Sequence, residues 1–584
     1  MKFLRNLFAS IFGTLIGIGL LLLLIVLIAS LVSDTKEVEV KSNSVLTLNL
    51  KSVVKDYAPK SSNFLDEVFN INERKIGLNE ILNAIENASY DDNIKGISIS
   101  TLGISAGVAQ MQAIRNKLLE FKQSGKFIYA YADMYDQKSY YLSSVADSIF
   151  VNPRGAVDFK GLATEILYYK DFENKFGVKY EVIRHGKYKS AVEPYLTNKM
   201  SDNNKEQITS FLKSIWNGLT LDISKSRNIS IQKLNNIADN LLGRNANSAK
   251  DNKLVDGIIY ADEYKDKLKN AVETPLKETL NRVSLPNYIT TGKGRIRSSA
   301  SDKIAVIYAQ GEIIYGKGDE DNIGQDLIIN ALRKARESAN TKAIVLRVNS
   351  PGGSALTSEL IWREIELTKK QIPVVVSMGN VAASGGYYIS CNANKIIAEP
   401  TTITGSIGVF GMLPNVSDLA NKLGINAEQV KTNNNPSYSV FEPISDEFKK
   451  VTKEGVEAVY TTFLDRVAKG RNLSVETVDS IAQGRVWTGA QAIKNGLVDE
   501  LGNLHTAVVE AASLAGITDY GIRNYPSYHM NLEDKFSKLP FIKSKEKILI
   551  EEFGQENYRI YKSLRNMTNA KGIQARLPFT LTIN

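Results

Sequence analysis

Apolar and polar positions along most of the chain alternate between short strand-like runs and longer helical periodicities. From residue 304 onward, this pattern predicts strands over 304–308, 343–348 and 373–377 and helices over 324–339, 354–370 and 382–393. The same alternation runs through residues 81–150. Strands that alternate with helices favour parallel sheets whose faces are covered by helices. The pattern therefore predicts the α/β fold class.

Two stretches of the chain are copies of one another at a constant offset of 247 residues. Residues 139–153 (SYYLSSVADSIFVNP) align without a gap with residues 386–400 (GYYISCNANKIIAEP), and 174–178 align with 421–425. Near the C-terminal ends of the copies the offset falls to 243, as expected if insertions gather in loops. A period this long predicts two tandem domains rather than a solenoid.

The N-terminal region contains one long apolar stretch. Residues 7–33 carry no charge, and a helix needs about 20 apolar residues to cross a bilayer. A cleaved signal peptide is the alternative, but its apolar core runs only about 7–15 residues, so the length favours an uncleaved anchor. Lys2 and Arg5 precede the stretch. By the positive-inside rule we expect a cytoplasmic N-terminus, with the rest of the chain on the outer, periplasmic side of the cytoplasmic membrane.

At 584 residues the chain is too long for one hydrophobic core, since domains average roughly 150 residues. We expect a cytoplasmic N-terminus (1–6), a transmembrane anchor (7–33), a first repeat (44–289), a linker (290–302), a second repeat (303–525) and a C-terminal tail (526–584). Within the tail, the pattern predicts a helix over 545–567 and an extended segment over 572–583.

The chain is basic, with a net charge of +9 and a pI near 9.0. It has no concentrated Lys/Arg block and no nucleic-acid motif, so we expect no nucleic-acid partner and attribute the charge to a surface near an anionic lipid bilayer. Its single cysteine, Cys391, cannot form an internal disulfide. The chemistry expected below requires neither a metal nor another cofactor.

Two motifs at strand-to-helix junctions of the second copy carry candidate chemistry. Residues 349–354 (NSPGGS) place Gly352 and Gly353 after a buried strand, where backbone N–H groups can approach a substrate as an oxyanion hole requires. A plain tight turn explains the same letters. In residues 379–388 (GNVAASGGYY), Ser384 lies where a strand gives way to a helix, an arrangement similar to a nucleophile elbow. Close helix packing is the alternative there.

A serine nucleophile needs a base, which is usually a histidine. None of the three histidines lies in a motif that suggests a triad, and His185 is the strongest of them because it is near Lys187 and Lys189. A lysine can serve instead if it is neutral, which requires its pKa of about 10.4 to fall by about 3 units through apolar burial. The residues alone do not decide between these bases.

Five motifs, in this order, resemble those of the bacterial signal peptide peptidase A family, also called protease IV, in its long duplicated form. They are YKSAVEP (188–194), RVNSPGG (347–353), AASGGYY (382–388), TGSIGV (404–409) and GRVWTG (484–489) followed by GLVD (496–499). The resemblance extends from the anchor to about residue 530. It implies two tandem repeats related to the Clp protease subunit and to crotonases. It also implies a homotetramer and a membrane-anchored serine endopeptidase that degrades cleaved signal peptides and other short apolar peptides.

The resemblance also implies roles for particular residues. Ser384 is the expected nucleophile, Lys189 the general base, and Ser406 the residue that supports the lysine. The expected oxyanion donors are the backbone N–H groups of Gly353 and Gly385, and the neighbouring Gly352 remains an alternative to Gly353. Read without the resemblance, Lys189 could be an ordinary solvated lysine, and Ser406 a turn serine.

Comparison of the two copies predicts where the site lies. At the 247-residue offset, Ser384 corresponds to Gln137, Ser406 to Phe159 and Gly353 to Ala106, so the first copy lacks these groups. The second copy has Pro436 or, with a two-residue shift, Tyr438 in place of Lys189. Neither copy holds a complete Ser/Lys pair, and the sequence predicts one site shared between them.

Two other classes of function fit parts of the sequence. One is a catalytically idle membrane scaffold that binds peptides, but the retained serine, glycine pair and lysine disfavour it. The other is acyl-CoA chemistry on the shared crotonase fold. The expected anchor and the lack of an acid/base carboxylate motif disfavour that reading.

Overall fold

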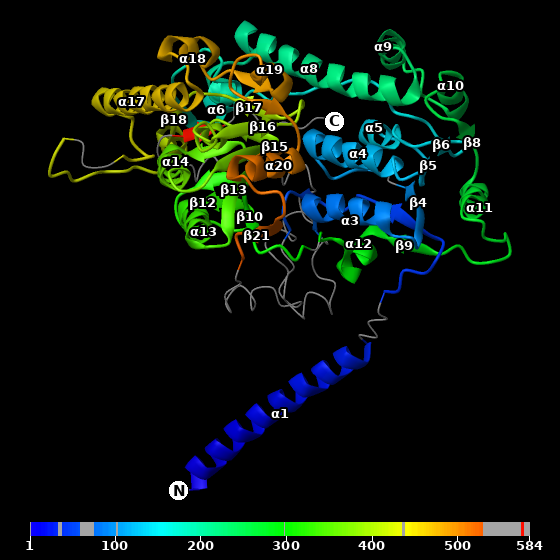
Figure 1. Cartoon of the computed structure of the whole chain (residues 1–584). Helices are drawn as coiled ribbons and strands as arrows, with labels where there is room; N and C mark the ends of the chain where they lie inside the picture. The colour runs from blue at the N-terminus through cyan, green and yellow to red at the C-terminus, as the bar shows by residue number, and fades with distance from the viewer. Residues whose placement is uncertain are drawn as a thin grey trace.

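A computed structural model describes residues 2–32, 38–58, 75–100, 103–296, 298–434, 438–528 and 574–576, with the side chains of residues 4 and 21–32 excepted. Helix α1 (Lys2–Val32) lies apart from the β-sheets (Figure 1). Within this described part of the chain, no helix meets the length and apolarity that a membrane crossing requires. The structure describes no side chains for residues 21–33 of the predicted anchor. The helix predicted over 545–567 lies entirely outside the described residues.

The first repeat is built on a six-stranded parallel sheet in the order β8-β6-β5-β4-β1-β9. Its strands are β1 (Ser44–Leu48), β4 (Ile94–Ile99), β5 (Phe127–Ala132), β6 (Ser148–Val151), β8 (Gly257–Ile258) and β9 (Arg282–Ser284). A short pair, β2 (Val54–Lys55) and β3 (Ile76–Gly77), lies outside this sheet. The helices are α3 (Leu78–Tyr90), α4 (Val108–Lys122), α5 (Gln137–Ser143), α6 (Lys170–Phe176), α7 (Glu193–Leu196), α8 (Asp202–Arg227), α9 (Ile231–Asp239), α10 (Ala246–Asp251), α11 (Ala261–Ala271) and α12 (Leu285–Tyr288).

The second repeat has an eight-stranded sheet whose central strands are also parallel. Its strands are β10 (Lys303–Gln310), β13 (Thr341–Ser350), β15 (Val374–Ala383), β16 (Lys395–Ala398), β17 (Ile403–Gly405), β19 (Val486–Thr488), β20 (Glu500–Leu501) and β21 (Gly521–Tyr525). The helices are α13 (Gln325–Glu337), α14 (Ala355–Lys369), α15 (Gly385–Tyr388), α16 (Ser417–Lys422), α17 (Asp446–Arg471), α18 (Val475–Ile481), α19 (Gly489–Ala492) and α20 (Leu504–Ala515).

The structure confirms the duplication. Helices α3 and α13 begin and end 247 residues apart, as do α4 and α14, and strands β6 and β16 keep the same offset. The long helices α8 and α17 begin 244 residues apart, so the drift toward 243 begins before them. Helices cover the sheets of both repeats (Figure 1), as the alternating pattern predicts.

A third sheet joins the repeats, and the sequence pattern did not predict it. Its order is β12-β11-β14-β22-β18-β7, with parallel and antiparallel neighbours. The strands are β7 (Lys179–Arg184), β11 (Glu312–Ile314), β12 (Asn322–Gly324), β14 (Gly352–Ser354), β18 (Phe410–Asn415) and β22 (Gln574–Arg576). Strands of three residues are too short to show an alternation of polar and apolar positions. Because β7 belongs to the first repeat and β18 to the second, their pairing makes this sheet span both repeats.

The helix predicted over 382–393 is wrong at its start and at its end. Strand β15 continues to Ala383, and α15 covers only Gly385–Tyr388. The strand is long because it changes partners: its first half pairs with β16 and its last residues pair with β17. This extension brings the end of β15 to the candidate site.

Polar contacts buried between the repeats also join them. Asp56, next to β2, pairs with Arg347 on β13 at 3.3 Å, and each side chain is 1% exposed. Gln110 of the first repeat donates to the same carboxylate at 3.0 Å. Removing one member would leave a buried charge without its counter-ion, which typically costs about 3–5 kcal/mol. The interface between the repeats therefore contains a buried ion pair whose two members come from different repeats.

Candidate active site

The predicted motifs converge because they follow neighbouring strands of one sheet. Strands β13, β15 and β17 are parallel neighbours, so their carboxyl ends lie at the same edge. Gly352 and Gly353 follow β13, Ser384 follows β15, and Ser406 follows β17. The carboxyl edge of a parallel sheet is the usual place for a binding site in α/β folds.

Ser384 sits in a strained turn between β15 and α15. Its φ is 55° and its ψ is −116°, a backbone conformation that non-glycine residues rarely adopt. Two backbone bonds hold the turn: the Ser384 N–H donates to the Gly405 carbonyl, and the Tyr388 N–H donates to the Ser384 carbonyl, each at 2.8 Å. The strand-to-helix elbow expected from the sequence is therefore present.

Lys189 reaches this edge from the other repeat. Strand β7 runs antiparallel to β18, with Arg184 opposite Phe410, and Lys189 follows five residues later. The Tyr188 N–H donates to the Gln483 carbonyl at 2.9 Å, and an Arg184 guanidinium N–H donates to the Lys189 carbonyl at 3.1 Å. Lys187, two residues earlier, is exposed. The β7–β18 pairing thus places Lys189 at the buried edge beside Ser384 and leaves Lys187 exposed to solvent.

The structure brings Lys189, Ser384 and Ser406 into direct contact. Lys189 Nζ lies 2.8 Å from Ser384 Oγ, 3.0 Å from Ser406 Oγ and 3.1 Å from the Ser406 carbonyl oxygen. A neutral amine has two N–H donors and one lone pair. Lys189 Nζ is placed to donate to all three oxygens, and Ser384 Oγ lies 3.5 Å from the Gly408 carbonyl oxygen. A neutral lysine in the same place can use its lone pair to accept a proton from the Ser384 hydroxyl.

Burial favours the neutral form of this lysine. Lys189, Ser384 and Ser406 are each 0% exposed. Burial holds the pKa of the Lys189 amine well below its usual range. Among the described residues, its three hydrogen-bond partners are uncharged, so no ion pair with them offsets the cost of burying an ammonium.

Glycines form the slot that holds the lysine, and the sequence reasoning gave them no role. A Cβ added at Gly484 would lie 2.6 Å from Lys189 Cβ, and one at Gly408 would lie 3.2 Å from Lys189 Cδ. Gly484 also has a φ of 79°, which disfavours any side chain. Both glycines lie in the resembling motifs GRVWTG and TGSIGV, which is the signal that could have singled them out.

The three predicted oxyanion glycines also lie at this edge. A Cβ on Gly352 would lie 2.7 Å from the Gly385 nitrogen, so these two backbones are in close contact. The Gly352 N–H donates to Ser350 Oγ at 3.1 Å. Gly353 is itself paired with Ile313 of β11 and Ala575 of β22, so Gly353 as the partner of Gly385 stays a prediction.

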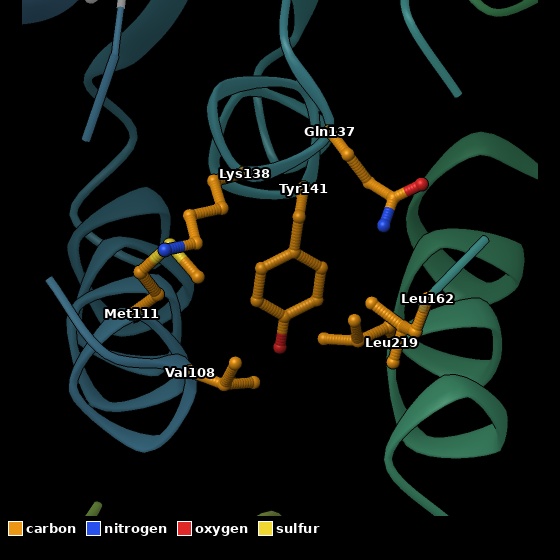
Figure 2. Close-up of a pocket in the computed structure, with 7 residues that line it drawn as sticks. All are labelled: Val108, Met111, Gln137, Lys138, Tyr141, Leu162 and Leu219. Atoms are coloured by element: carbon orange, nitrogen blue, oxygen red, sulfur yellow. The ribbon is translucent and has the colours of Figure 1, made fainter. Parts of the chain in front are cut away.

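The corresponding place in the first repeat is filled. Gln137, the counterpart of Ser384, donates to the Gly161 carbonyl at 2.9 Å and accepts from the Gly161 N–H at 2.9 Å. Phe159, the counterpart of Ser406, is 2% exposed and packs against Trp216. Figure 2 shows the small pocket beside Gln137, where Tyr141 and Leu219 project between the helices. Its volume of about 10 Å³ is roughly what one water needs, too little for a peptide side chain.

His185, the strongest alternative base in the sequence, has partners other than Ser384. His185 Nδ1 lies 2.7 Å from Glu457 Oε2, and its ring stacks on Tyr460 with 3.8 Å between centroids. His529 lies outside the described residues. So does Pro436, the second-copy position that aligns with Lys189.

Comparison with known proteins identifies the family and the fold class. The model of Peptidase family S49 matches residues 120–274 and 366–518, one segment in each repeat, and the Clp protease model matches residues 295–404. "Protease 4" of Haemophilus influenzae is 37% identical over 526 residues, which cover 88% of this chain and 85% of that protein. The "Putative signal peptide peptidase SppA" of Enterococcus faecium is 35% identical over 237 residues, or 39% of this chain and 69% of that protein. A solved ClpP1 mutant from Listeria monocytogenes is 15% identical with a TM-score of 0.24, covering 35% of this chain and 94% of that one.

These matches define a peptidase with a duplicated, Clp protease-like α/β fold and mixed as well as parallel sheets. The chain belongs to Peptidase family S49.

Proposed function

We propose that this protein is a serine endopeptidase with a Ser/Lys dyad. The observation that carries the proposal is the 2.8 Å contact between Lys189 Nζ and Ser384 Oγ, made by a buried lysine whose pKa is lowered by desolvation. Ser384 is the nucleophile, Lys189 is the general base, and Ser406 holds the amine by accepting two hydrogen bonds.

In the proposed reaction, Ser384 Oγ attacks the scissile carbonyl carbon while Lys189 Nζ takes the hydroxyl proton. The Gly353 and Gly385 N–H groups stabilise the oxyanion of the tetrahedral intermediate. The protonated Lys189 then gives its proton to the leaving amine, and an acyl-enzyme remains. Lys189, again neutral, takes a proton from the water that hydrolyses the acyl group and restores Ser384.

We also propose the setting that the sequence predicts. The apolar residues 7–33 anchor the chain in the cytoplasmic membrane, with the N-terminus inside and both repeats on the periplasmic side. The substrates are cleaved signal peptides and other short apolar peptides, which the resemblance and the name of the Enterococcus relative support. A homotetramer follows from the resemblance alone.

The lowered pKa of Lys189 predicts how activity depends on pH. Only the neutral amine can accept the Ser384 proton, so kcat/KM should rise as pH increases through the folded-state pKa of Lys189 and then level off. Because burial lowers that pKa, the plateau should be reached well below pH 10.5, the ordinary lysine value. A pH series of kcat/KM on a short apolar peptide measures this limb. A midpoint near pH 10.5 would contradict a buried neutral base.

A fluorophosphonate probe tests the proposed function directly. The probe reacts with an activated serine, so the full-length protein should be labelled once, and peptide mapping by mass spectrometry should place the label on Ser384. A chain that binds apolar peptides but neither cleaves them nor takes the label would instead be the idle scaffold.

A further inference from the structure

Helix α8 of the first repeat packs against strand β19 of the second. Side chains of the helix form hydrogen bonds across this interface. The Val486 N–H donates to Gln207 Oε1 at 3.3 Å, and two turns further along α8 Ser214 Oγ lies 2.7 Å from Thr488 Oγ1. Gln207 is 0% exposed. It is therefore a buried link between the repeats, with Ser214 as a second link on the same helix.

The amide nitrogen of Gln207 holds the segment that carries Lys189. Gln207 Nε2 lies 3.1 Å from the Tyr188 carbonyl oxygen, 2.9 Å from Ser190 Oγ and 3.1 Å from Asn204 Oδ1. The first two acceptors belong to the residues immediately before and after Lys189. The two N–H groups of an amide nitrogen are shared among these three acceptors. Gln207 thus fixes the chain on both sides of the lysine, while the amine itself contacts the serines of the site.

The amide oxygen of Gln207 leads to the group on the other side of that amine. Its donor, Val486, directly follows Arg485, whose carbonyl accepts from the Ser406 N–H at 2.6 Å. Ser406 in turn presents two oxygens to Lys189 Nζ. One buried amide therefore ties the segment that carries the proposed base to the strand that holds the base's hydrogen-bond partner.

A second tie between the same segments lies nearer the surface. Arg485 Nη2 donates to Glu206 Oε1 at 2.9 Å, and Arg485 Nη1 donates to the Tyr188 hydroxyl at 3.0 Å. The Glu206 side chain is 53% exposed. Exposed ion pairs contribute little, whereas a buried polar group that loses its partner is costly. The buried amide of Gln207 is therefore the stronger of the two ties.

We propose that Gln207 is a positioning residue of the candidate active site, which holds Lys189 at hydrogen-bond distance from Ser384 by linking the two repeats. The inference rests on the proposed function, because the placement of Lys189 matters for catalysis only if Lys189 is the base. Without the link the lysine segment can move away from Ser384, and a misplacement of about 1 Å can lower a rate about 100-fold. Water would also reach the amine, which weakens the effect of burial on the lysine pKa.

The test uses full-length variants, a short apolar peptide and a pH series. Gln207→Leu keeps a similar volume and removes the hydrogen bonds. We expect kcat to fall about 10-fold to 100-fold. KM should stay within about twofold, because a fully buried side chain does not contact the peptide. The rising limb of kcat/KM should move up by about one pH unit, toward the ordinary lysine value.

Ser214→Ala is the matched control, because it breaks a hydrogen bond between the same helix and the same strand. It should leave kcat within about twofold and the pH midpoint unchanged. Ser190→Ala removes one acceptor of Gln207 and nothing larger than a hydroxyl. It should change kcat and the pH midpoint in the same directions as Gln207→Leu, by smaller amounts. Circular dichroism checks the fold of each variant.

A folded Gln207→Leu protein with wild-type kcat and pH midpoint would overturn the positioning role and leave the Ser/Lys dyad standing. Equal changes in Ser214→Ala would do the same, because the effect would then come from loosening the repeat interface in general. If Gln207→Leu does not fold, wild-type values in Ser190→Ala would overturn the proposal, and the smaller changes expected there would support it. Absence of both peptide cleavage and probe labelling in the wild type would overturn the proposed function and this inference with it.

Discussion

Replacing Ser384 with alanine is expected to lower kcat for peptide cleavage by about 10⁴-fold or more, because no other group at the site can form the acyl-enzyme. The fold should survive, since alanine fits the space of the serine. The φ of 55° is unfavourable for both residues. Steady-state cleavage of a short apolar peptide, with circular dichroism as a check on folding, measures the effect.

Ser390→Ala provides a matched control for this substitution. Ser390 is also 0% exposed and comes six residues later, and its hydroxyl donates to the Gly386 carbonyl at 2.7 Å. Its loss should cost about 1 kcal/mol of stability and little activity. If Ser384→Ala kept more than a few per cent of the wild-type kcat, Ser384 would not be the nucleophile.

Replacing Lys189 with methionine is expected to cost a comparable factor, about 10⁴-fold in kcat, because the Ser384 hydroxyl would lose its base. Methionine has nearly the length of lysine and suits a buried slot. Lys187→Met is the control: Lys187 is exposed two residues earlier, and its loss should leave kcat within about twofold. Peptide cleavage at one pH on the plateau compares the three proteins.

The stability of the Lys189→Met protein separates a lost base from a damaged fold. Unfolded lysine binds a proton below pH 10.5, whereas burial disfavours that proton in the folded protein. Between the folded-state pKa and pH 10.5 the unfolded state therefore holds more protons, and wild-type stability rises with pH in that window. The methionine variant lacks this titration, so the Tm of the wild type relative to that of the variant should rise with pH across this window. A Tm difference that does not change with pH would contradict a buried neutral lysine.

Much of the fold could be predicted from the sequence because the duplication is clear. The 247-residue offset and the βα alternation predict both parallel sheets. The third sheet could not be predicted, because β14 and β22 have only three residues each and pair with each other although they lie far apart in the chain. The helix predicted over 382–393 begins too early, because pairing with β17 keeps Ala382 and Ala383 extended.

The geometry of the candidate site was harder to predict than the fold, because more of it depends on tertiary contacts. The elbow at Ser384 could be predicted from its small neighbours after a strand. The burial of Lys189 beside Ser384 could not be predicted from the residues alone, because it follows from the pairing of β7 with β18. The slot glycines were missed because Gly484 and Lys189 are neighbours only after the two repeats have packed together.

The central claim is that the two repeats of a single chain complete one site, with the base from the first repeat and the nucleophile from the second. Co-expression of differently tagged Ser384→Ala and Lys189→Met chains, followed by tandem purification and a peptide-cleavage assay, tests it most directly. Wild-type chains co-expressed with the double variant serve as the positive control and should retain activity. We expect the mixed pair to be as inactive as each variant alone. Cleavage restored to a substantial fraction of the control would contradict a site built within one chain.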